Sequence, residues 1–166
     1  MWLVCVNIVI TSFRKRKDIV SEVYLMVVTE NEVHEMTKPK IMVVEDEVSL
    51  RKLESIFLSS RGYLVCEMCN GEEALDSIET EMPDLVLLDV MMPGVDGYEV
   101  CRQIKANPLT KHIPIVLLTA RKGEDDIAKG EEVKADRYLT KPFKTSVVLE
   151  VIKSFLINDH SCLSST

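Results

Sequence analysis

Short apolar runs alternate with longer amphipathic stretches from Lys40 to Ile157. The apolar runs cover residues 41–44, 63–68, 85–88, 115–118 and 137–140. Apolar residues on successive positions over four to six residues are typical of parallel strands that are buried on both faces. The amphipathic stretches predict helices over residues 47–60, 71–80, 97–106, 123–134 and 145–157. Strict alternation of this kind predicts an open α/β fold, with a five-stranded parallel sheet and five helices on both of its faces.

The first predicted helix, 47–60, carries its apolar side chains at Leu50, Leu53, Ile56 and Phe57. This spacing predicts that the four form its apolar face. Gly62 follows the predicted end of the helix, where glycine is a common stop signal.

The first 37 residues differ from the rest of the chain. Their apolar stretch at 2–10 is shorter than the roughly 20 residues of a membrane helix, and the basic run 14–17 follows it instead of preceding it, unlike a secretory signal. Three interpretations stay open: a poorly ordered extension, an added hairpin or helix, or sequence upstream of a functional start at Met36. We expect an N-terminal extension (1–37), one domain (38–157) and a C-terminal tail (158–166).

Composition limits the classes of partner. The chain has 166 residues, of which 46% are hydrophobic and 28% charged, as in a globular protein with a real core. A net charge of −7 and a pI near 5.1 argue against a surface built for nucleic acid or anionic lipid, so we expect no direct DNA binding and no membrane binding. Five scattered cysteines predict no disulfide framework, which suits a cytoplasmic protein.

Polar residues stand where four of the five predicted strands end. Glu45, Asp46 and Glu47 follow the first strand and Asp89 follows the third, while Thr119 and Lys141 follow the fourth and fifth. Ligands of open parallel sheets bind at the carboxyl ends of the strands. If these strands are neighbours, the side chains converge on one site.

The chemistry of this set points to a metal and a phosphoryl group. Asp46 and Asp89 are hard oxygen ligands that suit Mg²⁺. Lys141 and Thr119 offer a positive charge and a hydroxyl donor to phosphoryl oxygens. The set fits an aspartate nucleophile that becomes an acyl phosphate. Glu47 is expected only to begin the helix, where acidic residues are favoured.

Four motifs, VVEDE, LVLLDVMMPGVDGYEV, IPIVLLTA and YLTKPF, occur in this order. Over residues 38–157 the chain resembles the receiver domain of two-component response regulators. The resemblance implies a flavodoxin-like fold with strand order 2-1-3-4-5. It also implies that Asp89 accepts a phosphoryl group from a phosphohistidine of a sensor histidine kinase or phosphotransfer protein.

The same resemblance implies a cofactor and its ligands. Asp46, Asp89 and the backbone carbonyl of Met91 would bind Mg²⁺, with Mn²⁺ as an alternative. Glu45 would complete the acidic pocket, acting through water.

A switch is implied as well. Lys141 would contact the phosphoryl group, and its bond to Pro142 would be cis. Thr119 would turn toward the phosphoryl oxygens and Tyr138 would swing inward, which changes the surface formed by helix 123–134, strand 137–140 and helix 145–157. This surface would bind a downstream effector or support a phosphorylation-dependent dimer.

The chain departs from the family pattern at two positions. Glu45 stands where many receivers have aspartate, and its longer side chain is still expected to reach the acidic pocket. Lys134 stands where family members usually have glycine, so the helix before it is expected to end differently. Arg121, near the mouth of the site, would tune the loss of the phosphoryl group to water.

Two other protein classes fit the sequence less well. A flavodoxin needs a phosphate-binding loop after the first strand, where this chain is acidic. A phosphatase of the haloacid dehalogenase type needs an aspartate at position 91, which is Met91. The alternative is a receiver-like interaction module that acts without phosphorylation. Whether the chain counts as an enzyme stays open, since a receiver catalyses its own phosphorylation and dephosphorylation without conventional turnover. The sequence does not choose between a stand-alone regulator, a phosphorelay carrier and a fragment.

Overall fold

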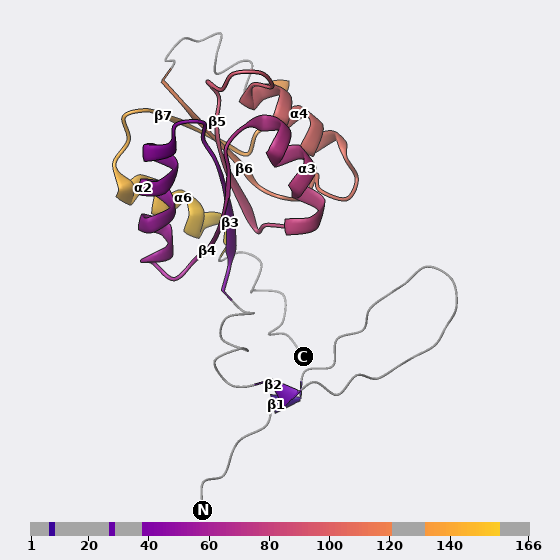
Figure 1. Cartoon of the computed structure of the whole chain (residues 1–166), viewed down its shortest axis with the longest axis vertical. Helices are drawn as coiled ribbons and strands as arrows, with labels where there is room; N and C mark the ends of the chain where they lie inside the picture. Colours follow the sequence, from indigo (N-terminus) through magenta and orange to yellow (C-terminus); the bar gives the residue numbers. More distant parts are fainter. Residues whose placement is uncertain (1–6, 9–26, 29–37, 121–131, 157–166) are drawn as a thin grey trace, which may run out of the picture. The chain divides into compact units, whose positions relative to one another are not determined.

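The computed structural model describes residues 7–8, 27–28, 38–120 and 132–156 (Figure 1). Contacts divide the chain into two compact units, Met1–Lys38 and Pro39–Thr166. In the first unit, strand β1 (Asn7–Ile8) pairs in antiparallel fashion with strand β2 (Val27–Val28). No helix of the described ranges has both the length and the apolar character needed to cross a bilayer.

The second unit is built on a five-stranded parallel sheet. Its strands are β3 (Lys40–Val44), β4 (Leu64–Met68), β5 (Leu85–Asp89), β6 (Ile115–Thr119) and β7 (Arg137–Thr140). They lie in the order β4-β3-β5-β6-β7, and every neighbouring pair is parallel. Numbered within the sheet, this is the order 2-1-3-4-5, so the predicted fold class is confirmed.

Four described helices cover the two faces of the sheet. They are α2 (Val48–Ser59), α3 (Gly71–Glu81), α4 (Gly97–Ala106) and α6 (Thr145–Leu156). Figure 1 shows α2 and α6 on one face, with α3 and α4 on the other. Most of the fifth expected helix, 123–134, lies outside the described residues, as does Arg121.

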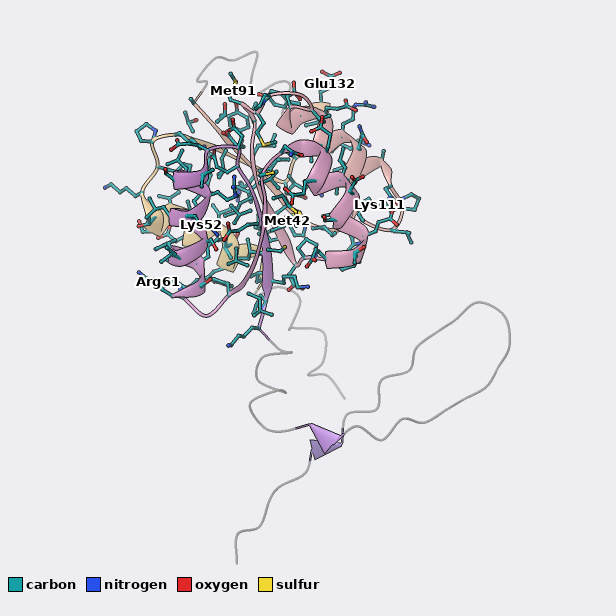
Figure 2. The ribbon with its side chains drawn as sticks, in the orientation of Figure 1. Met42, Lys52, Arg61, Met91, Lys111 and Glu132 are labelled. Atoms are coloured by element: carbon teal, nitrogen blue, oxygen red, sulfur yellow. The ribbon has the colours of Figure 1, made fainter. Side chains whose placement is uncertain are left out.

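The sheet separates two hydrophobic clusters. Along β3, Met42 and Val44 point to the cluster beneath α3 and α4, whereas Ile41 and Val43 point to the cluster beneath α2 and α6. The three central strands therefore need apolar residues on both faces along the run between their polar end residues. The edge strands β4 and β7 are only partly buried. In Figure 2, Met42 lies inside the domain, Lys52 lies on α2 and Arg61 lies just beyond the end of that helix.

The predicted apolar face of α2 is wrong for three of its four residues, whereas Phe57 is half-buried and packs against the cluster beneath α2 and α6. Leu53 and Ile56 are 64% and 67% exposed, and Leu50 is exposed too. The stripe that turns inward consists of residues 51, 54, 55 and 58, spaced as one helical face. Of these, Leu58 alone is an apolar residue, and it is fully buried. Arg51 and Glu54 occupy the stripe with it, so the apolar pattern was misleading at Leu50, Leu53 and Ile56.

Candidate functional site

Three carboxylates meet at the carboxyl end of the sheet. Glu45, Asp46 and Asp89 each offer an oxygen, and these oxygens all lie within 4.8 Å of one another. Strand register explains the meeting. Val44 of β3 pairs with Leu88 of β5, so the residues that follow them, Glu45 and Asp89, lie side by side. Glu45 and Asp89 are buried, with 2% and 6% exposure, whereas Asp46 is exposed. Clustered oxygens of this kind are the donor set that Mg²⁺ prefers.

Lys141 brings the positive charge to this pocket. Its Nζ lies 2.7 Å from Oε2 of Glu45 and 3.3 Å from Oδ2 of Asp89. The backbone positions it, since the Lys141 amide donates to the carbonyl of Thr119 over 2.6 Å as β7 ends beside β6. The peptide bond from Lys141 to Pro142 is cis, as the resemblance implied.

Burial and charge act together on two pKa values in the pocket. Burial raises the pKa of Glu45, and the hydrogen bond from Lys141 only partly offsets this effect. Burial alone would lower the pKa of Lys141. The hydrogen bond to Glu45 and the charge of Asp89 outweigh it, so the pKa of Lys141 is raised. The ammonium is therefore held in its charged form between two acids.

The remaining predicted residues surround Asp89. The amide of Met91 lies 3.4 Å from Oδ1 of Asp89, and the Met91 side chain is exposed. Thr119 ends β6 and is fully buried. Tyr138 is half-buried against the cluster beneath α3 and α4, and its hydroxyl lies 3.3 Å from that of Tyr98 on α4. The Tyr98 contact was not predicted.

Glu47 begins α2, as predicted. It is the residue before the first helical position, and its carbonyl accepts from the amide of Arg51 over 3.0 Å. Its side chain makes no capping hydrogen bond.

Arg51 is a positioning residue that the sequence analysis missed. Its Nη1 donates to the carbonyl of Glu45 over 2.6 Å and to that of Asp46 over 3.3 Å. Its Nε lies 3.7 Å from Oε2 of Glu67 on β4. The guanidinium thus fixes the backbone of the acidic loop. The available signal was a basic residue one helical turn after an acidic run.

Gly97 lets helix α4 approach Asp89. A Cβ at this position would collide with the carbonyl oxygen of Asp89 and would lie 2.8 Å from Cα of Val90. The Gly97 amide also donates to the carbonyl of Val90 over 3.2 Å. No other residue type fits between the helix and the end of β5 without movement of the backbone.

Lys134 adopts the left-handed conformation that glycine favours. Its φ is +59°, one of two positive values at non-glycine positions in the described ranges. The expectation that the backbone here departs from the glycine-type ending is therefore wrong at this residue. Lysine takes this conformation at a cost of roughly 1–2 kcal/mol relative to the right-handed one.

Comparison with known proteins agrees with this geometry. The family model of the response regulator receiver domain matches residues 41–153. The chain belongs to this family. Among receiver-containing relatives, it is 46% identical over 117 residues to the alkaline phosphatase synthesis transcriptional regulatory protein PhoP of Bacillus subtilis. It is 41% identical over 118 residues to the phosphate regulon transcriptional regulatory protein PhoB of Rhizobium meliloti. These matches cover 70% and 71% of the chain but only 48% and 52% of the relatives, so the chain spans about half of their length.

Solved receiver structures share the fold. The chemotaxis protein CheY4 of Vibrio cholerae superposes with a TM-score of 0.68 at 28% identity, covering 72% of this chain and 99% of that one. The receiver domain of the sensor histidine kinase PA1611 from Pseudomonas aeruginosa PAO1 gives 0.67 at 29% identity, covering 72% and 98%. The latter structure holds a magnesium ion in its active-site cleft.

Proposed function

We propose that this receiver accepts a phosphoryl group on Asp89 within a two-component system or phosphorelay. The donor would be the phosphohistidine of a sensor histidine kinase or phosphotransfer protein. As a carboxylate oxygen of Asp89 bonds to phosphorus, the bond from phosphorus to the imidazole nitrogen breaks. The observation that supports this best is the Lys141 ammonium, 3.3 Å from Asp89, in a pocket that otherwise gathers acids.

The residues present fit a magnesium ion. Asp46, Asp89 and the Met91 carbonyl would hold it, with Glu45 acting through water, and Mn²⁺ would serve as an alternative. When bound, the metal supplies charge neutralisation to the phosphoryl oxygens. The protein's own contribution is positioning: Arg51 fixes the acidic loop, and Lys141 is held at the mouth of the pocket by β7.

The output would be a shift between two states of one surface. Thr119 would turn toward the phosphoryl group and Tyr138 would move inward, leaving its contact with Tyr98. The surface of helix 123–134, β7 and α6 would then bind an effector protein or a second copy of the chain. We place this activity in the cytoplasm, in a receiver over residues 38–157 that is flanked by an extension and a tail.

The deciding experiment is incubation with acetyl phosphate and Mg²⁺ followed by mass spectrometry of the intact chain. We expect a gain of one phosphoryl group that disappears in Asp89→Asn. Asp76→Asn, an exposed aspartate on α3, is the matched control and should gain the group normally. No gain, or a gain that survives Asp89→Asn, would favour the alternative of an interaction module that acts without phosphorylation.

A further inference from the structure

The hydroxyl groups of two tyrosines meet between helix α4 and strand β7. The Tyr98 hydroxyl lies 3.3 Å from that of Tyr138, and both side chains are half-buried against the cluster beneath α3 and α4. Hydrogen bonds between hydroxyls usually measure about 2.5–3.0 Å. The contact is therefore a weak hydrogen bond between partners 40 positions apart, and it can be released at little cost in free energy.

Tyr98 stands on a backbone that is fixed next to Asp89. It is the second residue of α4, and Gly97 before it packs so closely on β5 that an added Cβ would collide with the carbonyl of Asp89. The side chain of Asp96 accepts a hydrogen bond from the Glu99 amide over 2.9 Å, which caps the first turn of the helix. The start of α4 therefore holds Tyr98 at a set position relative to the proposed phosphoryl acceptor.

Tyr138 lies on the same face of the sheet as Thr119. Strands β6 and β7 pair Leu117 with Tyr138, two residues before Thr119. Residues two apart on a strand point to the same face, so Thr119 shares that face with Leu117 and Tyr138. Leu117 and Thr119 are fully buried, whereas part of the Tyr138 side chain reaches the surface. Because β7 holds its backbone, the Tyr138 ring can change position by rotation of the side chain alone.

We propose that the Tyr98 hydroxyl is a latch on Tyr138, which makes Tyr98 a positioning residue of the switch. The inference rests on the proposed phosphoryl acceptance, in which Tyr138 moves inward. That movement breaks the contact with Tyr98, so the contact stabilises the conformation that precedes phosphorylation. By linkage, a latch that favours this conformation lowers the apparent affinity of the pocket for a phosphoryl group. Tyr98 thus sets how strong a signal is needed to shift the surface of helix 123–134, β7 and α6.

The test removes one hydroxyl and follows the Tyr138 ring itself. The full chain is labelled with tyrosine that carries ¹³C in its ring, and Tyr138→Phe identifies the Tyr138 signal in NMR spectra. Trifluoroberyllate, an analogue of the phosphoryl group, is titrated into each variant at a constant, saturating Mg²⁺ concentration. Tyr98→Phe keeps an aromatic ring against the cluster and removes the latch. Before any trifluoroberyllate is added, its Tyr138 signal should lie closer to the saturated position than the signal of the unaltered chain does.

The affinity for trifluoroberyllate gives a second readout. The apparent Kd should fall about two- to fivefold in Tyr98→Phe, the effect of one weak hydrogen bond. Tyr63→Phe is the matched control, because Tyr63 is half-buried against the cluster on the opposite face of the sheet, and it should change neither readout. In a Tyr138→Phe background, Tyr98→Phe should have no further effect on the Kd, since the latch has lost its partner hydroxyl.

Three results would overturn the latch. They are an unchanged or raised Kd in Tyr98→Phe, a Tyr138 signal that does not move in the free variant, and an equal change of Kd with and without the Tyr138 hydroxyl. The last result would give Tyr98 a role in the fold alone. A failure of the proposed function looks different, because the unaltered chain would then respond neither to trifluoroberyllate nor to acetyl phosphate. That result would remove the switch and its latch together.

Discussion

The ammonium of Lys141 lies closer to Glu45 than to Asp89, at 2.7 Å and 3.3 Å. The lysine therefore already occupies the positive-charge position of the acidic pocket. A metal ion that enters the same pocket would compete with it for the acidic oxygens. A phosphoryl group on Asp89 would give the ammonium new oxygens to bind.

Lys141→Met should separate metal binding from phosphorylation. Without the ammonium the pocket is more negative, so the Kd for Mg²⁺ measured by calorimetry should fall severalfold. The rate of phosphorylation by acetyl phosphate should fall by about 100-fold, the typical effect of removing one donor that stabilises a transition state. Lys144→Met, at an exposed lysine, should change neither quantity. Weaker Mg²⁺ binding in Lys141→Met would show that the lysine supports the metal site instead of competing for it.

Glu54 should make the stability of the fold depend on pH. Because burial raises its pKa from the ordinary 4.5 to about 7, the folded state holds a proton that the unfolded state releases. Its contribution is fully present below pH 4.5 and is lost as pH rises through 7. The free energy of unfolding of Glu54→Gln, relative to the unaltered chain, should therefore rise by roughly 1–3 kcal/mol between pH 5 and pH 8. Urea titrations at both pH values measure it, and a flat difference would contradict the raised pKa.

Gly97→Ala should displace the backbone that carries Asp89, and so weaken the site. The added Cβ meets the end of β5 at Asp89 and Val90, so either the helix or the strand must shift. We expect a loss of about 1–3 kcal/mol in the free energy of unfolding, together with slower phosphorylation of Asp89. Gly62→Ala is an instructive control. Gly62 has φ +91° but nothing within 4 Å of a Cβ, so this variant should lose stability without slowing phosphorylation of the folded protein.

Deletion of residues 1–35 should leave the receiver intact. Both hydrophobic clusters of the described chain draw their side chains from residues 41–156, so the truncation removes none of them. The extent of phosphorylation and the urea midpoint should match those of the full chain. A truncated protein that fails to fold would refute the prediction and give the extension a structural role.

The residues at the strand ends could be predicted to lie together, because the carboxyl ends of neighbouring parallel strands lie at the same edge of a sheet. Once the apolar runs at 41–44 and 85–88 are neighbouring parallel strands, Glu45 and Asp89 must emerge at the same edge. The family resemblance supplied what periodicity could not, namely the strand order and the cis bond after Lys141.

Apart from Phe57, the inward side of α2 could not be predicted from hydrophobicity. Leu53 and Ile56 carry the apolar signal, yet Arg51 turns inward because its guanidinium binds two backbone carbonyls of the acidic loop. A contact made to the backbone of another segment leaves no trace in apolar periodicity. Apolar periodicity also gives no sign of the contact between the hydroxyls of Tyr98 and Tyr138, which are 40 positions apart in the sequence.

Glu45 and Lys141 are separated by 96 positions, and their ion pair forms only when β7 has joined the edge of the sheet. A ribosome-bound chain that lacks its last strand would already contain Asp89 and both acids of the loop, but not the ammonium. Competence to receive a signal would thus arrive late in the synthesis of the receiver domain. Incomplete or misassembled copies would stay silent in the pathway and would not compete with finished ones for the phosphodonor's output.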